Sequence, residues 1–201
     1  MLWREERPLV LASQSRARGM LLSNAGLMFE AIPAAIDERA IQKASGLRDP
    51  AEVAMTLAAE KARAVALRFP DRIVVGADQT LALGERLFDK PADRDAARLQ
   101  LRLLAGKTHE LHSAFAVAIG GDIVTTQAAV ARMTLRPLDD SAIECYLDAA
   151  GEAVTTSVGA YQLEGLGVHL FERIEGDHFT VLGLPLLPLL AFLRQRGLVS
   201  I

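Results

Sequence analysis

Strand and helix patterns alternate along the first half of the chain, and a long hairpin pattern follows them. Short apolar runs at residues 9–12 and 27–32 are typical of strands, with a polar loop and a helical pattern between them. Residues 108–119 and 123–135, separated by Gly120-Gly121-Asp122, predict a β-hairpin. This order of elements favours a mixed sheet with helices on its faces.

A capped helix and a buried strand lie in the middle of that pattern. The Asp-Pro-Ala-Glu segment at residues 49–52 supplies an N-cap, a first-turn proline and an acidic third residue, so we expect a helix to about Phe69. Residues 73–75 are β-branched and apolar, which predicts an interior strand that ends in residues 76–80. Residues 37–39 are expected in a polar loop. Further expected elements are a short strand pair around Gly84-Glu85, helices at residues 93–104 and about 140–149, a strand at 168–174 and one or two C-terminal helices.

The composition excludes several classes of protein. With 201 residues, 51% of them hydrophobic, the chain is too apolar to be disordered and long enough to bury a core without disulfides or a structural metal. Its single cysteine, Cys145, forms no disulfide framework, which predicts a cytoplasmic location. A formal net charge of −3 argues against a protein that coats nucleic acid. We expect one domain, or a tightly joined pair of lobes, over residues 1–201.

Neither end of the chain has the pattern of an export or membrane segment. Residues 1–8 are charged, so they are not expected to form a signal peptide. Residues 181–193 are strongly apolar, but a glycine and two prolines interrupt them and they are too short to span a bilayer. We therefore interpret them as buried core and expect no membrane partner.

Several standard motifs are absent from the sequence. There is no GxxxxGK[ST], HExxH or GxSxG motif, and Gly165-Leu166-Gly167 lacks the third glycine of a dinucleotide loop. His109 and His112 are three residues apart on a predicted strand and would face opposite sides, which argues against a zinc pair. Individual polar residues are therefore the better candidates for chemistry.

Asp78 is the first of these candidates. It follows the predicted strand at residues 73–75, and ligands of open α/β sheets bind beyond the carboxyl ends of the strands. A carboxylate there can hold a divalent cation or take a proton from water. An aspartate that merely starts a turn fits the sequence equally well.

The loop Ser13-Gln14-Ser15-Arg16-Ala17-Arg18 is the second candidate. Its hydroxyls, guanidinium groups and free backbone N–H groups at the start of a helix suit an anion such as phosphate. Serine in this place more often only caps the helix. Two arginines favour the anion, since cations oppose the helix dipole there unless an anion offsets them.

Two lysines and two glutamates are further candidates, each with an ordinary alternative. Lys61 falls on an apolar helix stripe, and its ammonium either reaches bulk water or points into a polar cleft. Lys90 lies in a loop, where it is either solvated or in contact with phosphate. Glu38 and Glu164 are interpreted as loop carboxylates, and loop carboxylates are most often only hydrated. Glu164, in a glycine-flanked loop, can accept hydrogen bonds from an N–H edge such as that of guanine.

Six blocks of these residues stand in order along the chain and together resemble one family, and the resemblance extends from about residue 9 to residue 193. They are Leu-Ala-Ser-Gln-Ser-Arg-Ala-Arg at 11–18, Asp-Glu at 37–38, Lys61, Gly-Ala-Asp-Gln at 76–79, Asp-Lys-Pro at 89–91 and Val-Gly-Ala-Tyr-Gln-Leu-Glu-Gly-Leu-Gly at 158–167. The series resembles the Maf (septum formation protein) family of nucleoside triphosphate pyrophosphatases.

The resemblance implies a fold, a reaction and a cofactor. The implied fold is an elongated mixed α/β sheet flanked by helices, with two lobes and a central cleft, related to inosine triphosphatases and usually found as a homodimer. The implied reaction is hydrolysis of a nucleoside triphosphate between its α and β phosphates, giving a monophosphate and pyrophosphate. It requires a divalent cation such as Mg²⁺, Mn²⁺ or Co²⁺, and the implied role is house-cleaning of non-standard nucleotides.

The resemblance also implies roles for particular residues. Asp78 matches the acidic residue that accepts a proton from water and lies near the metal. Ser13 and Arg18 match the loop that holds phosphate, Lys61 and Lys90 match the phosphate-facing lysines, and Glu38 matches the acidic residue of an Asp-Glu pair. The chemistry agrees, because a triphosphate needs cations to spread its developing charge and a carboxylate to orient water.

Three positions bear on base preference. In the family that the chain resembles, the side chain at the position of Ala17 helps to choose the base. Ala17 matches neither of the two subgroups of that family. Gln79 and Glu164 follow the subgroup that acts on 7-methylguanosine triphosphate rather than the one that acts on thymidine and uridine triphosphates. We therefore expect a guanine-type or modified purine triphosphate. A nucleotidyltransferase, whose phosphate-loop glycines are missing here, and a nucleotide-binding regulator of cell division without catalysis are the alternatives.

Overall fold

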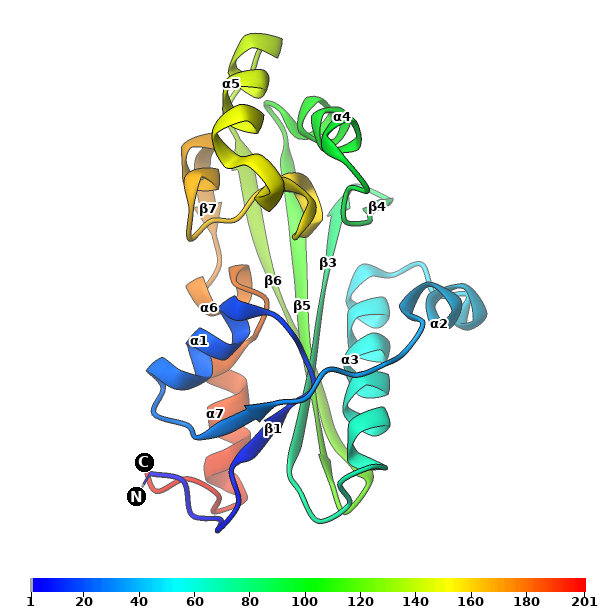
Figure 1. Cartoon of the computed structure of the whole chain (residues 1–201), viewed down its shortest axis with the longest axis vertical. Coiled ribbons are helices and arrows are strands. Elements are labelled where there is room, and N and C mark those ends of the chain that lie inside the picture. The colour runs from blue at the N-terminus through cyan, green and yellow to red at the C-terminus, as the bar shows by residue number, and fades with distance from the viewer. Residues whose placement is uncertain (1) are drawn as a thin grey trace. The chain divides into compact units, whose positions relative to one another are not determined.

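The computed structural model describes residues 2–201, and within them the strands form one seven-stranded mixed sheet (Figure 1). Its order is β2-β1-β3-β5-β6-β7, with β4 paired to β3. Strand β1 is parallel to β2 and β3, whereas β3–β4 and β6–β7 are antiparallel. The expected mixed sheet with helices on its faces is confirmed. The strands are β1 (Leu9–Leu11), β2 (Phe29–Ala31), β3 (Val74–Leu83), β4 (Arg86–Phe88), β5 (Thr108–Ile119), β6 (Asp122–Leu135) and β7 (Phe171–Glu175).

Most helices begin at aspartate caps that the sequence shows directly. The side chains of Asp49, Asp93 and Asp139 each accept a hydrogen bond from the backbone N–H three residues on, which confirms the predicted cap at Asp49. The α-helices are α1 (Arg16–Asn24), α2 (Glu38–Ser45), α3 (Pro50–Ala66), α4 (Arg94–Leu104), α5 (Asp140–Ala150), α6 (His178–Val181) and α7 (Leu186–Gln195). Short 3₁₀ turns are η1 (Gly151–Thr155), η2 (Val158–Ala160) and η3 (Leu166–Leu170). None of the helices in residues 2–201 is long and apolar enough to cross a membrane.

The chain divides into two compact units. The first contains the chain up to Gln79, Ser113–Ala129 and His178–Ile201. Its strands carry two apolar layers because alternate side chains face opposite sides of a sheet. Val75 and Ala77 belong to the apolar layer that includes residues of α1 and α7, whereas Val74 belongs to the layer built on α3. Figure 1 shows α1 and α7 on one side of the strands and α3 on the other. The interpretation of residues 181–193 as core is confirmed for the residues of α7 that enter the first layer.

The second unit contains Thr80–His112 and Val130–Asp177. Helix α4 packs against α5 and the turn η2 there, and Arg98 on α4 pairs with Glu144 on α5. A buried aromatic cluster joins His109 on β5 to Tyr161 and Phe171.

Two expectations about the local structure around site residues are wrong. Strand β3 does not end at residues 76–80 but continues to Leu83, because its second half pairs with β4 through Leu81↔Phe88 and Leu83↔Arg86. Asp78 therefore lies inside a strand and does not start a turn. The expected polar loop at residues 37–39 is instead the start of α2, where Asp37 is the N-cap and Glu38 the first helical residue. Helix α2 is only eight residues long and buries none of them.

Candidate functional site

Asp78 and Lys61 form a buried ion pair in the first unit. Lys61 Nζ donates to Asp78 Oδ1 at 2.5 Å and also lies 2.9 Å from Glu38 Oε1. The exposed fractions of Asp78 and Lys61 are 6% and 8%, so neither charge is solvated by bulk water. Of the two outcomes left open for Lys61, the ammonium reaches carboxylates rather than bulk solvent.

A glycine allows the helix and the strand to approach closely enough for this contact. Gly76 lies two residues before Asp78 on the same face of β3. A Cβ on Gly76 would lie 2.1 Å from the Ala58 carbonyl oxygen and 2.6 Å from the Ala62 nitrogen. The backbone of α3 therefore packs directly on β3, and Lys61 is brought within hydrogen-bond distance of Asp78.

Burial and charge act in opposite directions on Asp78. Burial raises the pKa of the Asp78 carboxyl, because the charged form loses its hydration. The positive charges of Lys61 and Arg18 offset part of this effect, and the negative charge of Glu38 adds to it. The net result is a carboxylate that binds protons more readily than an ordinary aspartate, as a general base requires.

The two serines of the polar loop before α1 make different hydrogen bonds. Ser15 Oγ caps the helix by accepting from the Arg18 backbone N–H at 3.4 Å. Ser13 does not cap the helix; its Oγ accepts from the Ser15 backbone N–H and, at 3.1 Å, from Arg18 Nη1. Ala17 is partly buried against the apolar layer of α1 and α7. The capping alternative therefore accounts for Ser15 and leaves Ser13 beside the guanidinium.

Arg18 reaches back from α1 to the strand that carries Asp78. Its Nη1 donates to the Ala77 carbonyl oxygen at 2.8 Å, and its Nε donates to the Gly183 carbonyl oxygen at 2.7 Å. Burial lowers the pKa of Arg18, and the charges of Asp78 and Glu38 oppose that effect. Arginine stays protonated in proteins, so the group remains a fixed cation. The structure thus brings together five of the predicted residues: Ser13, Arg18, Glu38, Lys61 and Asp78.

Gln79 faces the opposite side of β3 from Asp78, as alternation along a strand requires. Its Nε2 donates to Ser113 Oγ at 2.9 Å and to the carbonyl oxygens of Thr180 and Val181 at 3.2 and 3.1 Å. Ser113 is fully buried and donates to the Thr180 carbonyl oxygen at 2.7 Å. No sequence pattern marks Ser113, and Gly183 stands out in the sequence only as an interruption of an apolar run. Both contact site residues that are distant in sequence.

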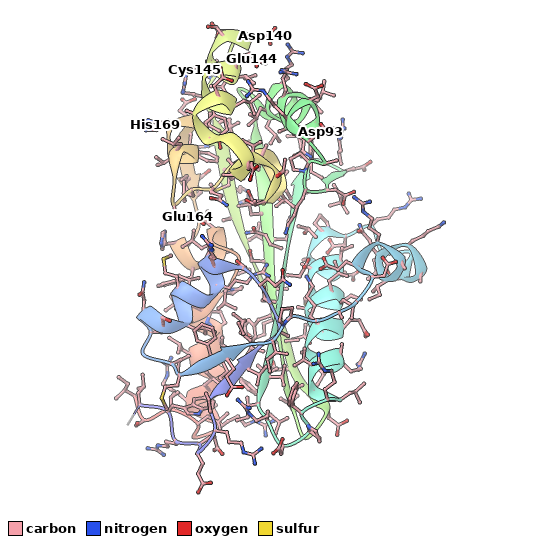
Figure 2. The ribbon with its side chains drawn as sticks, in the orientation of Figure 1. Asp93, Asp140, Glu144, Cys145, Glu164 and His169 are labelled. Atoms are coloured by element: carbon pink, nitrogen blue, oxygen red, sulfur yellow. The ribbon has the colours of Figure 1, made fainter. Side chains whose placement is uncertain are left out.

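Lys90 and Glu164 lie in the second unit and have exposed side chains. Glu164, labelled in Figure 2, stands on a tight turn in which the Gly165 N–H donates to the Gln162 carbonyl oxygen at 3.2 Å. A Cβ on Gly167 would lie 2.4 Å from that same oxygen, so this glycine closes the base of the turn. Tyr161, directly before the turn, is anchored by a 2.6 Å hydrogen bond between its hydroxyl and His109 Nε2.

The carboxylates of the first unit fit a hard divalent cation. Asp78 and Glu38 come from different elements and both approach one cationic nitrogen, that of Lys61. In residues 2–201 no group of three or more His, Cys, Asp and Glu side chains is gathered as a metal cage. A Mg²⁺-type ion that acts on phosphates commonly takes only one or two carboxylates and completes its shell with phosphate and water oxygens. The donor set therefore suits a cation that arrives with a polyphosphate.

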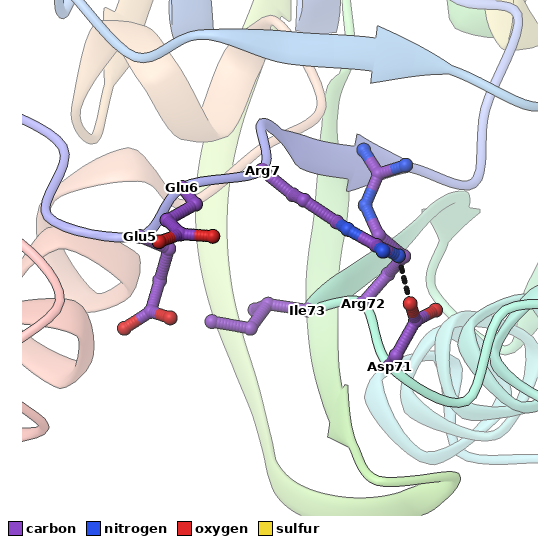
Figure 3. A pocket seen from close by; sticks show the side chains of 6 residues that line it. All are labelled: Glu5, Glu6, Arg7, Asp71, Arg72 and Ile73. Carbon is purple, nitrogen blue, oxygen red and sulfur yellow. Dashed lines mark hydrogen bonds and ion pairs between the residues drawn. The ribbon is translucent and has the colours of Figure 1, made fainter.

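A separate pocket of about 320 Å³ lies elsewhere in the first unit (Figure 3). Its lining mixes acidic and basic side chains, and Arg7 pairs with Asp71 within it. None of the predicted site residues lines this pocket. The lining residues are Glu5, Glu6, Arg7, Asp71, Arg72 and Ile73.

Comparison with known proteins points to one family. The family described as Maf-like protein matches residues 8–196. A "Nucleoside triphosphate pyrophosphatase" of Rhodopseudomonas palustris (strain BisB18) is 63% identical over 99% of this chain and 98% of its own. One of the same name from Bradyrhizobium diazoefficiens is 65% identical over 100% and 99% of the two chains. A "7-methyl-GTP pyrophosphatase" of Rhizobium meliloti (strain 1021) is 53% identical over 96% and 98%.

Proposed function

Because the chain belongs to the family of Maf-like proteins, we propose that it hydrolyses nucleoside triphosphates to nucleoside monophosphates and pyrophosphate. One observation carries this function to particular residues: the buried Asp78 carboxylate lies against Lys61, with Glu38 on the same ammonium and Arg18 held on the preceding residue. A base and several cations beside one another are what hydrolysis of a phosphoanhydride requires.

In the proposed reaction Asp78 accepts the proton of the water that attacks the anhydride between the α and β phosphates. Its raised pKa favours that proton transfer. Arg18 and Lys61 bind phosphate oxygens as cations, and Ser13 holds the Arg18 guanidinium through a hydrogen bond. The P–O bond to the leaving group breaks, and pyrophosphate departs with the bridging oxygen.

We assign Asp78 to a divalent cation, with the Glu38 carboxylate beside it. Bound there, Mg²⁺, Mn²⁺ or Co²⁺ would neutralise the charge that develops on the phosphates. Equilibrium titration of the metal into the nucleotide-free protein tests this assignment without reference to turnover. Asp78→Asn is expected to weaken binding, and unchanged affinity would contradict the assignment.

The Asp78→Asn variant also tests the reaction. Pyrophosphate release is expected from the wild type and to fall at least about 100-fold in the variant, because an amide cannot accept the proton. Binding of the triphosphate should persist, since the cations Arg18 and Lys61 are intact. Absence of hydrolysis in both proteins would favour a nucleotide-binding regulator. Transfer of a nucleotidyl group to an acceptor other than water would favour a nucleotidyltransferase.

For the base, we propose a guanine-type or otherwise modified purine. Glu164 is exposed on the turn that contains the Gly165–Gln162 hydrogen bond, and its ionised carboxylate can only accept hydrogen bonds, which suits a base edge that donates N–H groups. A substrate panel in which thymidine and uridine triphosphates rank best would overturn this preference. Glu164→Gln should shift the ranking toward pyrimidines by about tenfold.

We propose that the protein works in the cytoplasm as a homodimer. Cys145 is a free, exposed cysteine, which suits a reducing compartment. Light scattering of the purified protein tests the assembly, and a mass of one chain at micromolar concentration would exclude the dimer.

A further inference from the structure

The guanidinium of Arg18 is held so that only one of its nitrogens is left for a ligand. A guanidinium carries five N–H donors, one on Nε and two on each terminal nitrogen. Nε donates to the Gly183 carbonyl oxygen, and Nη1 donates to both Ser13 Oγ and the Ala77 carbonyl oxygen. These three bonds fix the plane of the group and leave the two donors of Nη2.

The turn after α6 supplies one of those three acceptors and fits closely around the guanidinium. Gly183 has a φ of +90°, a conformation that L side chains rarely adopt. A Cβ at this residue would lie 3.3 Å from Arg18 Nε and 3.4 Å from Nη2, which is tighter than ordinary van der Waals contact. Alanine here would therefore strain the backbone and push against the two nitrogens that fix and present the guanidinium.

Two side chains from the sheet bind the last residues of α6, from which this turn continues. Gln79 on β3 donates to the carbonyl oxygens of Thr180 and Val181, and Ser113 on β5 donates to that of Thr180. Ser113 Oγ also accepts from Gln79, so the three residues form one hydrogen-bonded network. The position of the Gly183 carbonyl is thereby coupled to β3, the strand that carries Asp78.

We propose that the turn at residues 180–183 is a positioning element for phosphate recognition, in which Gly183 and Ser113 act through Arg18 and do not touch the substrate. This inference rests on the proposed function, in which Arg18 binds phosphate. It identifies Nη2 as the nitrogen that contacts a phosphate oxygen, and it makes Gly183 and Ser113 positioning residues rather than catalytic ones.

Gly183→Ala tests the proposal, with Gly197→Ala as its matched control. Gly197 also follows a helix of the first unit with a positive φ, +69°, but a Cβ there meets nothing within 4 Å. Calorimetry with Mg²⁺ and pyrophosphate is expected to show about tenfold weaker binding for Gly183→Ala, since a hydrogen bond to a charged group is misaligned. The KM for the triphosphate should rise by a similar factor while kcat changes less than about threefold. Gly197→Ala should match the wild type in both measurements.

A double-mutant cycle shows whether the effect passes through Arg18. Gly183→Ala should weaken pyrophosphate binding when Arg18 is present. In the Arg18→Lys variant the same substitution should weaken binding by less than about a further twofold. Equal losses in both backgrounds, or equal behaviour of Gly183→Ala and Gly197→Ala, would overturn the proposal.

Ser113→Ala provides a second variant in case Gly183→Ala does not fold, and it is expected to weaken pyrophosphate binding about threefold through the network. If Gly183→Ala does not fold, unchanged binding by Ser113→Ala overturns the proposal. The calorimetric comparison is independent of turnover, so a wild type that hydrolyses no triphosphate would refute the proposed function and still leave this comparison valid.

Discussion

Lys61 Nζ lies 2.5 Å from Asp78 Oδ1, and both side chains are buried. The Glu38 carboxylate lies 2.9 Å from the same ammonium, so Lys61 keeps an ionic partner when Asp78 is neutralised. The pair places a base and a cation beside each other before any substrate arrives. Three of the predictions that follow concern this pair or the packing that creates it.

Asp78→Asn should stabilise the metal-free protein at pH 7, although it lowers the activity that is measured with metal. The pKa of Asp78 is raised by burial, so the folded state binds the proton more tightly than the unfolded chain does. The stability from this group is therefore complete below the unfolded pKa and is lost as pH rises through the folded pKa. Asparagine avoids that loss, and each kcal/mol gained raises Tm by about 2 to 4 °C.

Thermal denaturation with a metal chelator, at pH 7 and at pH 3, measures this effect. The stabilisation should be present at pH 7 and shrink at pH 3. Glu85→Gln, which neutralises an exposed carboxylate in the β3–β4 turn, should leave Tm nearly unchanged. A lower Tm for Asp78→Asn than for the wild type at pH 7 would contradict the prediction.

Lys61→Met and Glu38→Gln should move the pKa of Asp78 in opposite directions in the metal-free protein. The positive charge of Lys61 lowers that pKa, so its removal should raise it further. The negative charge of Glu38 raises it, so Glu38→Gln should lower it. Carboxyl-carbon NMR across a pH titration reads the Asp78 carboxyl directly. Shifts of the same sign in the two variants would rule out this electrostatic account.

Local features of the sequence predicted most of the helices but not the position of Asp78. The caps at Asp49 and Asp93 depend on residues within one turn, so they are visible in sequence. The end of β3 was misplaced because Gly76 and Asp78 resemble a turn, whereas the strand continues through pairing with β4. That pairing joins distant segments and leaves no local signal.

Most residues of the candidate site could be predicted from the sequence, but the contacts between them could not. Asp78, Lys61 and Arg18 were found because charged residues in or next to apolar segments are conspicuous. Their contacts were not predictable, since the Lys61–Asp78 distance depends on how closely α3 packs on Gly76. Ser113 was missed because a lone buried serine on a strand has no distinctive pattern.

Gly76→Ala should strongly destabilise the protein and disrupt the site with it. The new Cβ would lie within 2.1 Å of the Ala58 carbonyl oxygen, so α3 must move away from β3. Overpacking of this kind costs about 1 to 3 kcal/mol or more, and Lys61 would move with the helix. Chemical denaturation measures the loss. Gly84→Ala is the control because a Cβ there meets nothing within 4 Å, although its φ of +59° makes a small loss expected. Equal stability of the two variants would contradict the close packing.

His109 should make the stability of the protein pH-dependent, and His109→Gln should remove that dependence. Burial lowers the pKa of His109 to about 4, so the unfolded chain takes up a proton near pH 6.5 while the folded protein does so only near pH 4. Stability is therefore lost as pH falls between these values, by about 3 kcal/mol.

Glutamine keeps an amide nitrogen near the Tyr161 hydroxyl but does not titrate. Between pH 7 and pH 4 the free energy of unfolding, measured by urea denaturation, should fall by about 3 kcal/mol less in His109→Gln than in the wild type. His169→Gln, which replaces an exposed histidine of the same unit, should behave as the wild type does, and an equal loss in all three proteins would show that His109 does not govern the pH dependence.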